Sequence, residues 1–147
     1  MQQLTFLSIP PGSDLHRQAV DLRYRVFFQS LGLPAETVRD AVEEKSLHLA
    51  AVHEHRLVGC GRLTVVLDAA QVSQLAVEPL CRGRGAGSEL LRRLVGRAGE
   101  DGVPLVWLNA RVACAPFYAR FGFVPVGDVF PSAKTGLPHQ RMELILP

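Results

Sequence analysis

The fold is decided by residues 75–91, which read Leu75-Ala76-Val77-Glu78-Pro79-Leu80-Cys81-Arg82-Gly83-Arg84-Gly85-Ala86-Gly87-Ser88-Glu89-Leu90-Leu91. A short apolar run ends at Glu-Pro, a compact loop of arginine and glycine follows, and a helix with leucines on one face comes next. Glycine has no Cβ, so its backbone N–H group can come close to a ligand. The start of the helix adds unpaired N–H groups and the positive end of the helix dipole. This combination is typical of a site that binds anions, phosphates above all.

The glycine spacing differs from those of two better-known phosphate loops. It is one residue too short for the dinucleotide pattern G-x-G-x-x-G, and no Gly-Lys-Ser/Thr follows to make a P-loop. An RNA-binding tract of arginine and glycine would be longer and would not stand between a strand and an amphipathic helix. From local chemistry alone, an ordinary glycine turn remains the alternative.

Composition sets the class of protein. A chain of 147 residues is most simply one domain over 1–147, and 48% hydrophobic with 20% charged residues is typical of a soluble globular protein. The net charge of +2 is too small to indicate a nucleic acid or a membrane as partner. Three cysteines without paired spacing fit neither a disulfide framework nor a zinc site, so we expect a cytoplasmic protein without a metal. Neither a signal peptide nor an apolar run of membrane length is apparent.

Hydrophobic periodicity and turn residues predict the order of the elements. Strands are expected over 4–9, 47–53, 57–67, 71–77, 105–109, 123–130 and 141–146, and helices over 14–29, 85–99 and 113–121, with a shorter helical piece near 35–45. Consecutive hairpin strands must be antiparallel, whereas a strand–helix–strand unit is parallel. The expected fold is therefore α/β (α+β), with a mixed, mostly antiparallel sheet of about six to seven strands flanked by helices.

This order, with Arg82-x-x-Gly85-x-Gly87 between the fourth strand and its helix, resembles the GNAT N-acetyltransferase superfamily. The superfamily's acyl-CoA signature is Arg or Gln, two residues, Gly, one residue, and Gly or Ala. A second block, in which a tyrosine precedes Gly-Phe, is matched further on by Asn109-Ala110-Arg111 and Phe117-Tyr118-Ala119-Arg120-Phe121-Gly122-Phe123.

A narrower resemblance is to the ElaA-like branch of that superfamily. The matching segments follow in the same order along nearly the whole chain: Leu22-Arg23-Tyr24-Arg25-Val26-Phe27, His48-Leu49, Gly59-Cys60-Gly61-Arg62-Leu63 and Gly136-Leu137-Pro138-His139-Gln140-Arg141-Met142. The chain departs from the branch where Ser30-Leu31 replaces Glu-Gln and Ala110-Arg111 replaces Ala-Gln. Both departures concern the acceptor site more than the CoA site.

The resemblance implies acetyl-CoA as co-substrate, with no metal. Its pyrophosphate would lie on Arg82, Gly83, Arg84, Gly85, Ala86, Gly87 and Ser88. Its pantetheine arm would lie between the backbone of Leu75, Ala76 and Val77 and the side of Asn109. A freed backbone N–H group in that strand would polarise the thioester carbonyl. Plain strand pairing, with Asn109 capping a turn, is the structural alternative.

Acyl transfer also needs an acid and a base. Tyr118 matches the family tyrosine that protonates the departing thiolate, although a core aromatic is the alternative. Glu78 and His139 are the candidate bases, since an imidazole exchanges protons near neutral pH. His48, Glu43 and Glu44 stay open, as does a chain of waters in place of a base.

The sequence therefore predicts an N-acetyltransferase that moves an acetyl group directly from acetyl-CoA to a primary amine of a small molecule or a peptide, as a monomer or homodimer. One alternative is an acyltransferase with a longer donor, similar to acyl-homoserine-lactone or N-acyl amino acid synthases. Another is a GNAT-like module that binds CoA without turnover.

Overall fold

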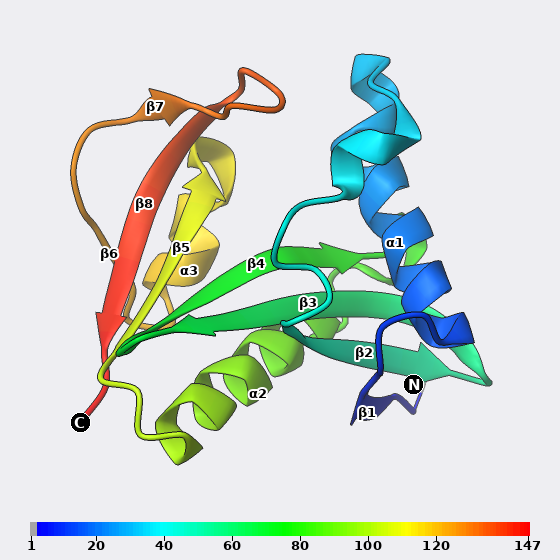
Figure 1. Ribbon diagram of the computed structural model, residues 1–147, viewed down its shortest axis with the longest axis horizontal. Helices are drawn as coiled ribbons and strands as arrows, with labels where there is room; N and C mark the ends of the chain where they lie inside the picture. The colour runs from blue at the N-terminus through cyan, green and yellow to red at the C-terminus, as the bar shows by residue number, and fades with distance from the viewer. Residues whose placement is uncertain (1–2) are drawn as a thin grey trace.

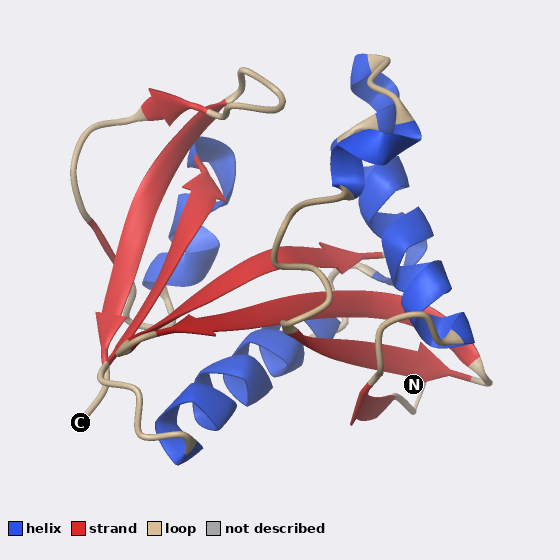
Figure 2. Ribbon diagram, in the orientation of Figure 1, coloured by secondary structure: helices blue, strands red, loops and turns tan. Residues whose placement is uncertain are grey.

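The computed structural model describes residues 3–147, whose strands form one mixed sheet with helices on both faces (Figures 1 and 2). The sheet has the order β1-β2-β3-β4-β5-β8-β6, and β7 pairs with β8. In chain order the elements are β1 (Thr5–Ser8), α1 (Asp14–Phe27), η1 (Gln29–Leu31), η2 (Ala35–Val38), β2 (Leu47–His53), β3 (Arg56–Val66), β4 (Ala69–Val77), η3 (Pro79–Cys81), α2 (Ala86–Glu100), β5 (Leu105–Arg111), η4 (Val112–Cys114), α3 (Ala115–Ala119), β6 (Val124–Pro125), β7 (Phe130–Pro131) and β8 (Pro138–Ile145), where η marks a 3₁₀ turn.

Two apolar clusters attach the long helices to opposite faces of the sheet. Ser13 caps α1 by accepting a hydrogen bond from the His16 N–H group, and Ala19 and Leu22 of this helix pack against β2, β3 and β4. The larger cluster lies under α2, whose Leu90, Leu91 and Leu94 are fully buried. α1 therefore covers one face of the sheet and α2 the other, as Figure 1 shows.

The sheet changes direction between β4 and β5, and this positions the site. All its other pairs are antiparallel, whereas β4 and β5 run parallel and pair only over Ala69–Gln71 and Leu105–Trp107. Beyond these residues the two strands diverge, so that β5 and β8 stand away from the rest of the sheet (Figure 1). The predicted mixed, mostly antiparallel sheet is confirmed.

Two elements in the last third of the chain differ from the sequence prediction. A strand was expected over 123–130, but only Val124–Pro125 and Phe130–Pro131 are extended and paired. Pro125 has no N–H group to continue a ladder, and Gly127 turns the chain with a φ of 77°. The helix expected over 113–121 is shorter, since α3 spans Ala115–Ala119 after the η4 turn.

No helix among residues 3–147 is both long and apolar enough to cross a membrane.

Candidate active site

The arginine–glycine loop has the backbone geometry of an anion site. Gly83 and Gly85 take φ values of 79° and 85°, and Gly85 precedes the first turn of the 15-residue helix α2. A Cβ at either glycine would meet nothing within 4 Å, so the left-handed backbone, and not crowding, requires glycine there. Within the described chain, the N–H groups of 83–88 donate to no protein acceptor. They are free for an anionic ligand.

A bulge in β4 opens the strand edge that leads away from this loop. Gln74 has a φ of 57°, and the pairing of β3 with β4 shifts between Cys60 and Arg62. Because β5 leaves β4 after Gln71, the β5-facing edge over 72–77 has no strand partner in the part of the chain described. An extended pantetheine arm could add to this edge as a strand would. The predicted role of Leu75, Ala76 and Val77 stays a prediction.

A cavity of about 480 Å³ lies where β4 and β5 diverge. Four predicted site residues line it: Leu75, Asn109, Tyr118 and His139. Ala76 and Val77 lie beyond its lining, on the strand towards the loop. Glu78 also lies outside the lining and forms an ion pair with Arg25, with Arg25 Nη2 2.7 Å from Glu78 Oε1. Of the two candidate bases, only His139 therefore lines the same cavity as Tyr118.

Tyr118 packs among aromatic side chains in the lining of the cavity. Its ring packs edge-on against Phe117 and Phe123, with centroids 5.0 Å and 6.1 Å away, and burial raises the pKa of its hydroxyl. The hydroxyl bonds to no described residue, and the described chain holds no fully buried side-chain N or O atom without a hydrogen-bond partner. The oxygen therefore keeps access to the cavity and carries its proton at neutral pH.

His139 has one ring nitrogen fixed by the backbone. Its Nδ1 lies 2.8 Å from the Leu137 carbonyl oxygen, which can only accept, so Nδ1 carries the proton. In the neutral ring Nε2 then has a free lone pair, as a base requires. In the sheet register His139 stands opposite Arg111 of β5 and Phe130 of β7.

A buried polar network backs the cavity, and Glu43 is its centre. Its carboxylate accepts hydrogen bonds from Arg23 Nη1 at 2.7 Å, Arg23 Nη2 at 2.9 Å and Arg62 Nη1 at 2.8 Å. Burial opposes its charge, but the bonds from Arg23 and His16 outweigh burial and hold the pKa of Glu43 well below its ordinary value. Asp40 forms a two-pronged ion pair with Arg62, at 2.9 and 2.8 Å.

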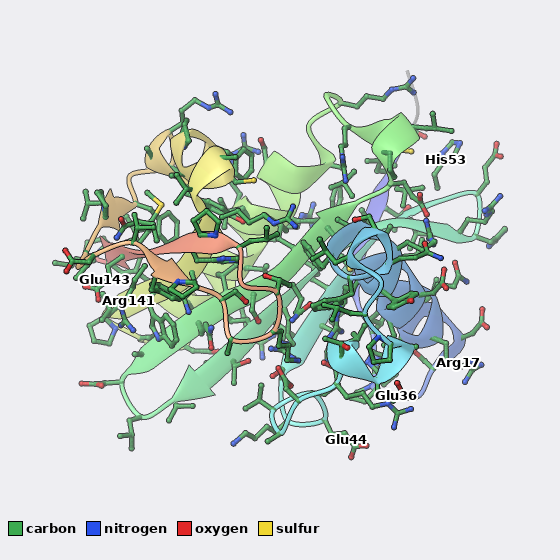
Figure 3. The ribbon with its side chains drawn as sticks, turned by 90° about the horizontal axis from the view of Figure 1, so that it is seen from above. Arg17, Glu36, Glu44, His53, Arg141 and Glu143 are labelled. Atoms are coloured by element: carbon green, nitrogen blue, oxygen red, sulfur yellow. The ribbon has the colours of Figure 1, made fainter. Side chains whose placement is uncertain are left out.

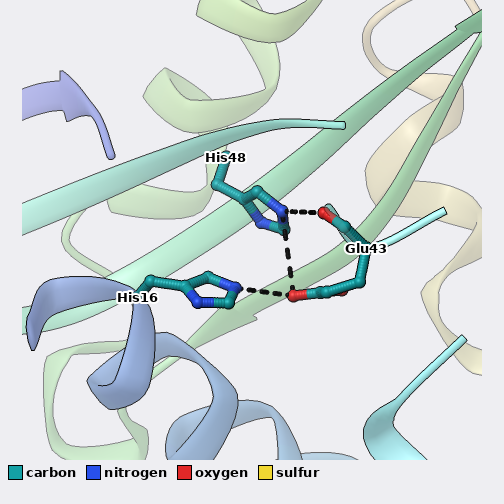
Figure 4. Close-up of side chains that lie close together, drawn as sticks. All are labelled: His16, Glu43 and His48. Carbon is teal, nitrogen blue, oxygen red and sulfur yellow. Dashed lines mark hydrogen bonds and ion pairs between the residues drawn. The ribbon is translucent and has the colours of Figure 1, made fainter. Parts of the chain in front are cut away.

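His16 and His48 complete this network as hydrogen-bond donors (Figure 4). Gly12 N donates to His16 Nδ1 at 3.0 Å, so the proton is on His16 Nε2, which donates to Glu43 at 2.8 Å. His48 Nε2 lies 2.7 Å from the Glu43 carbonyl oxygen, and burial lowers the pKa of His48. The three side chains are close enough to share a cation. However, both Nε2 atoms carry protons and two guanidinium groups already surround the carboxylate, so the donor set does not fit a metal.

Sequence reasoning missed most of this network. Arg62 lies in the apolar strand β3 and Arg23 on the buried face of α1, beside Ala19 and Leu22. A charged residue at a core-facing position is the signal that could have found both. Cys60 is buried, and burial raises the pKa of its thiol to about 12, whereas Cys114 is exposed.

A family model, curated proteins and solved structures all match this chain. The model of the family described as Acetyltransferase (GNAT) domain matches residues 13–146. The chain belongs to the GNAT acetyltransferase family. Members of this family use acetyl-CoA, and the loop, the freed edge of β4 and the cavity are the parts of this GNAT domain that could receive it.

Three proteins illustrate the similarity. YjcF of Bacillus subtilis (strain 168), an uncharacterized N-acetyltransferase, is 26% identical over 126 residues, which cover 86% of this chain and 89% of YjcF. The crystal structure of Escherichia coli ElaA has a TM-score of 0.78 at 23% identity and covers 96% of this chain and 98% of its own. An aminoglycoside 6'-N-acetyltransferase complexed with coenzyme A has a TM-score of 0.77 at 19% identity, covering 97% and 98%. Both structural similarities concern the fold.

Part of the lining of the GNAT cavity comes from the end of α1, from Asp40 and Val42 after η2, and from the β7–β8 loop. The loop between β7 and β8 reaches η2, because Lys134 Nζ donates to the carbonyl oxygens of Thr37 at 2.6 Å and Arg39 at 3.0 Å. Seen from above, this loop lies between Glu36 of η2 and the outer residues Arg141 and Glu143 of β8 (Figure 3). The arginine–glycine loop does not line this cavity, so the loop and the cavity are separate parts of the candidate site.

Proposed function

We propose that residues 1–147 act as one N-acetyltransferase domain that moves an acetyl group from acetyl-CoA to a primary amine of a small molecule. The observation that carries the proposal is the continuity of three features. Unpaired N–H groups at 83–88 lead to the freed edge of β4, and this edge leads to a cavity into which the Tyr118 hydroxyl opens. One end suits a pyrophosphate, the middle an amide-bearing arm, and the far end an acyl group and its acceptor.

The loop holds the donor through charge and backbone dipoles. Arg82 and Arg84 are exposed on it, and the start of α2 adds its dipole. Leu75, Ala76, Val77 and Asn109 would orient the pantetheine arm, because the strand edge offers backbone donors and acceptors at regular intervals.

Transfer then needs one bond made and one broken. The amine nitrogen of the acceptor bonds to the acetyl carbonyl carbon, and the carbon–sulfur bond breaks. Tyr118 gives its proton to the departing thiolate, so that free CoA leaves as a thiol. His139 Nε2 takes the proton that the amine nitrogen loses and releases it to solvent, while the Tyr118 phenolate takes up one proton from solvent, so that both groups return to their starting state. Acetylated amine and CoA are the only products.

Ligand binding and turnover test this proposal in two steps. At a hundred times its dissociation constant, acetyl-CoA stabilises its binder by about 2.7 kcal/mol, which raises the melting temperature of a chain of this size by roughly 5–10 °C. Free CoA and octanoyl-CoA serve as comparison ligands. Thiol release is then measured with a panel of amines. No shift with any of the three CoA ligands would refute the assignment, and a greater rate with octanoyl-CoA would favour the longer-chain alternative.

A further inference from the structure

The cavity carries an excess of positive charge on the side away from the phosphate loop. Its charged lining residues are Arg62, Arg111, Lys134 and a single carboxylate, Asp40. Asp40 is fully engaged, because both its oxygens accept hydrogen bonds from Arg62. Arg111 and Lys134 therefore remain as cations that no carboxylate in the described chain neutralises within 4 Å.

The backbone of Arg111 is fixed by strand pairing, whereas its guanidinium group has no partner among the described residues. It ends β5 opposite His139, which in turn stands opposite Phe130, so the three residues form one row across β5, β8 and β7. Directly opposed residues in antiparallel strands present their side chains on the same face. No residue in 3–147 forms a hydrogen bond or ion pair with the Arg111 guanidinium. A half-buried arginine in a cavity wall keeps donors free for a ligand.

Lys134 places a second charge in the lining of the cavity, where the β7–β8 loop contacts η2. Its ammonium donates to two backbone carbonyls and lies 5.9 Å from the centre of the Phe28 ring, which leaves one of its three protons unassigned. Partial burial lowers the pKa of Lys134, and the charges of Arg62 and Arg23 act in the same direction, whereas the charges of Asp40 and Glu43 oppose them. Lys134 is therefore a partly desolvated cation in the lining of the cavity.

The donor has no use for these cations. Its phosphates would lie on the arginine–glycine loop, none of whose residues over 83–88 lines the cavity. The acetyl thioester and the pantetheine arm are uncharged. We propose that Arg111 and Lys134 bind the acceptor, and that the acceptor is a small amine carrying its own anionic group, a carboxylate or a phosphate. This inference rests on the proposed acetyl transfer and names its substrate class.

The same charges explain how the acceptor would become reactive. Positive charge near an ammonium group favours loss of its proton, and only the neutral amine attacks a thioester. Acceptors with several ammonium groups, such as aminoglycosides and polyamines, are disfavoured by like-charge repulsion. Phe27, Phe28 and Phe130 also line the cavity, so an aromatic side chain on the acceptor would find apolar contacts.

Matched acceptor pairs test the inference. We would measure kcat/KM for acetyl transfer with β-alanine and β-alaninamide, L-phenylalanine and L-phenylalaninamide, and O-phosphoethanolamine and ethanolamine. Rates are expressed per neutral amine, since the members of a pair differ in amine basicity. At least one anionic member should exceed its neutral partner tenfold or more. The amino acid and phosphate pairs distinguish a carboxylate from a phosphate, and spermidine tests repulsion of polycations.

Variants locate the preference. Arg111→Gln and Lys134→Met should each lower that ratio by about tenfold, mainly through KM, because each removes one charge-assisted contact. Arg56→Gln removes the same charge from the exposed start of β3 and should leave the ratio unchanged. Two positions keep the test usable if one variant fails to fold.

Three outcomes overturn the inference while acetyl-CoA still shifts the melting temperature. The first is a kcat/KM for each neutral acceptor that equals or exceeds that of its anionic partner. The second is a ratio of anionic to neutral kcat/KM that neither Arg111→Gln nor Lys134→Met changes. The third is no acetyl transfer to any anionic amine. Absence of the acetyl-CoA shift refutes the proposed function itself, and this inference with it.

Discussion

Replacing Glu43 by Gln should destabilise the protein more than any other single exchange of an acid for its amide. The substitution keeps the side-chain shape but removes the charge that faces two arginines whose side chains are only 2% and 4% exposed. Arg62 keeps Asp40 as a partner, so the charge left uncompensated is that of Arg23. The amide NH2 group of the new Gln would also face the N–H groups of the arginines, which are donors as well.

The expected loss of stability follows from the number of arginines left without a carboxylate partner. Removing one partner of a buried ion pair costs about 3–5 kcal/mol. Because one of the two arginines stays paired, we expect the lower end, about 3 kcal/mol. For a chain of this length that corresponds to a fall in melting temperature of about 6–12 °C.

Urea and thermal unfolding at pH 7 measure this loss, with Glu44→Gln as the matched control. Glu44 is the next residue, is exposed, and is labelled at the surface in Figure 3. Its exchange should change the free energy of unfolding by less than about 0.5 kcal/mol. If the two variants differ by under 1 kcal/mol, the network does not carry the stability assigned to it.

Acid unfolding provides an independent check on the same residue. The pKa of Glu43 is lower in the folded protein than its ordinary value of 4.5. Its charge therefore stabilises the fold fully above pH 4.5, and this contribution is lost as the pH falls below that value towards the folded-state pKa. Glu43→Gln lacks the contribution at every pH. The difference in stability between wild type and variant should narrow below pH 4.5, and a constant difference would contradict the assigned cause.

Two further exchanges test the donor half of the site, and a third tests the stability of α2. Tyr118→Phe should lower kcat about a hundredfold and leave the dissociation constant of acetyl-CoA within roughly twofold, and an unchanged kcat would remove Tyr118 as the acid. Gly85→Val puts a β-branched residue at a φ of 85° and should weaken acetyl-CoA binding at least tenfold by calorimetry; retained affinity would place the phosphates elsewhere. Gly96→Ala, at an exposed position inside α2 with nothing within 4 Å of the new Cβ, should add about 0.5–1 kcal/mol to stability and leave acetyl-CoA affinity unchanged. Lower stability would show that this glycine has a packing role.

Local patterns predicted the parts of the site that are local. The loop at 82–87 and the segment from Asn109 to Tyr118 were found because each is a short run whose spacing already indicates its chemistry. The long strands and α1 and α2 were found through periodicity and their bounding turns, since a buried face leaves a regular trace in the sequence. The short strands β6 and β7 were predicted as one continuous strand over 123–130, because strands of two residues carry no period of their own.

Tertiary partners could not be predicted in the same way. Glu78 was a reasonable base from its place after β4, but its ion pair with Arg25 depends on how α1 crosses the sheet. The network around Glu43 joins α1, β3 and the segment between η2 and β2, which only the folded chain brings together. The charge of the cavity likewise comes from β3, β5 and the β7–β8 loop.

The bond from Lys134 to Thr37 and Arg39 has a consequence for engineering. It joins two surface segments that lie almost a hundred positions apart in the sequence. Lys134 lines the cavity, and so does Asp40, which follows Arg39. A chimera that received only the β7–β8 loop of a relative would lose the contacts that this loop makes with its own η2 segment. To change the substrate range, both segments should therefore be exchanged together, while the β4 edge and the arginine–glycine loop are kept.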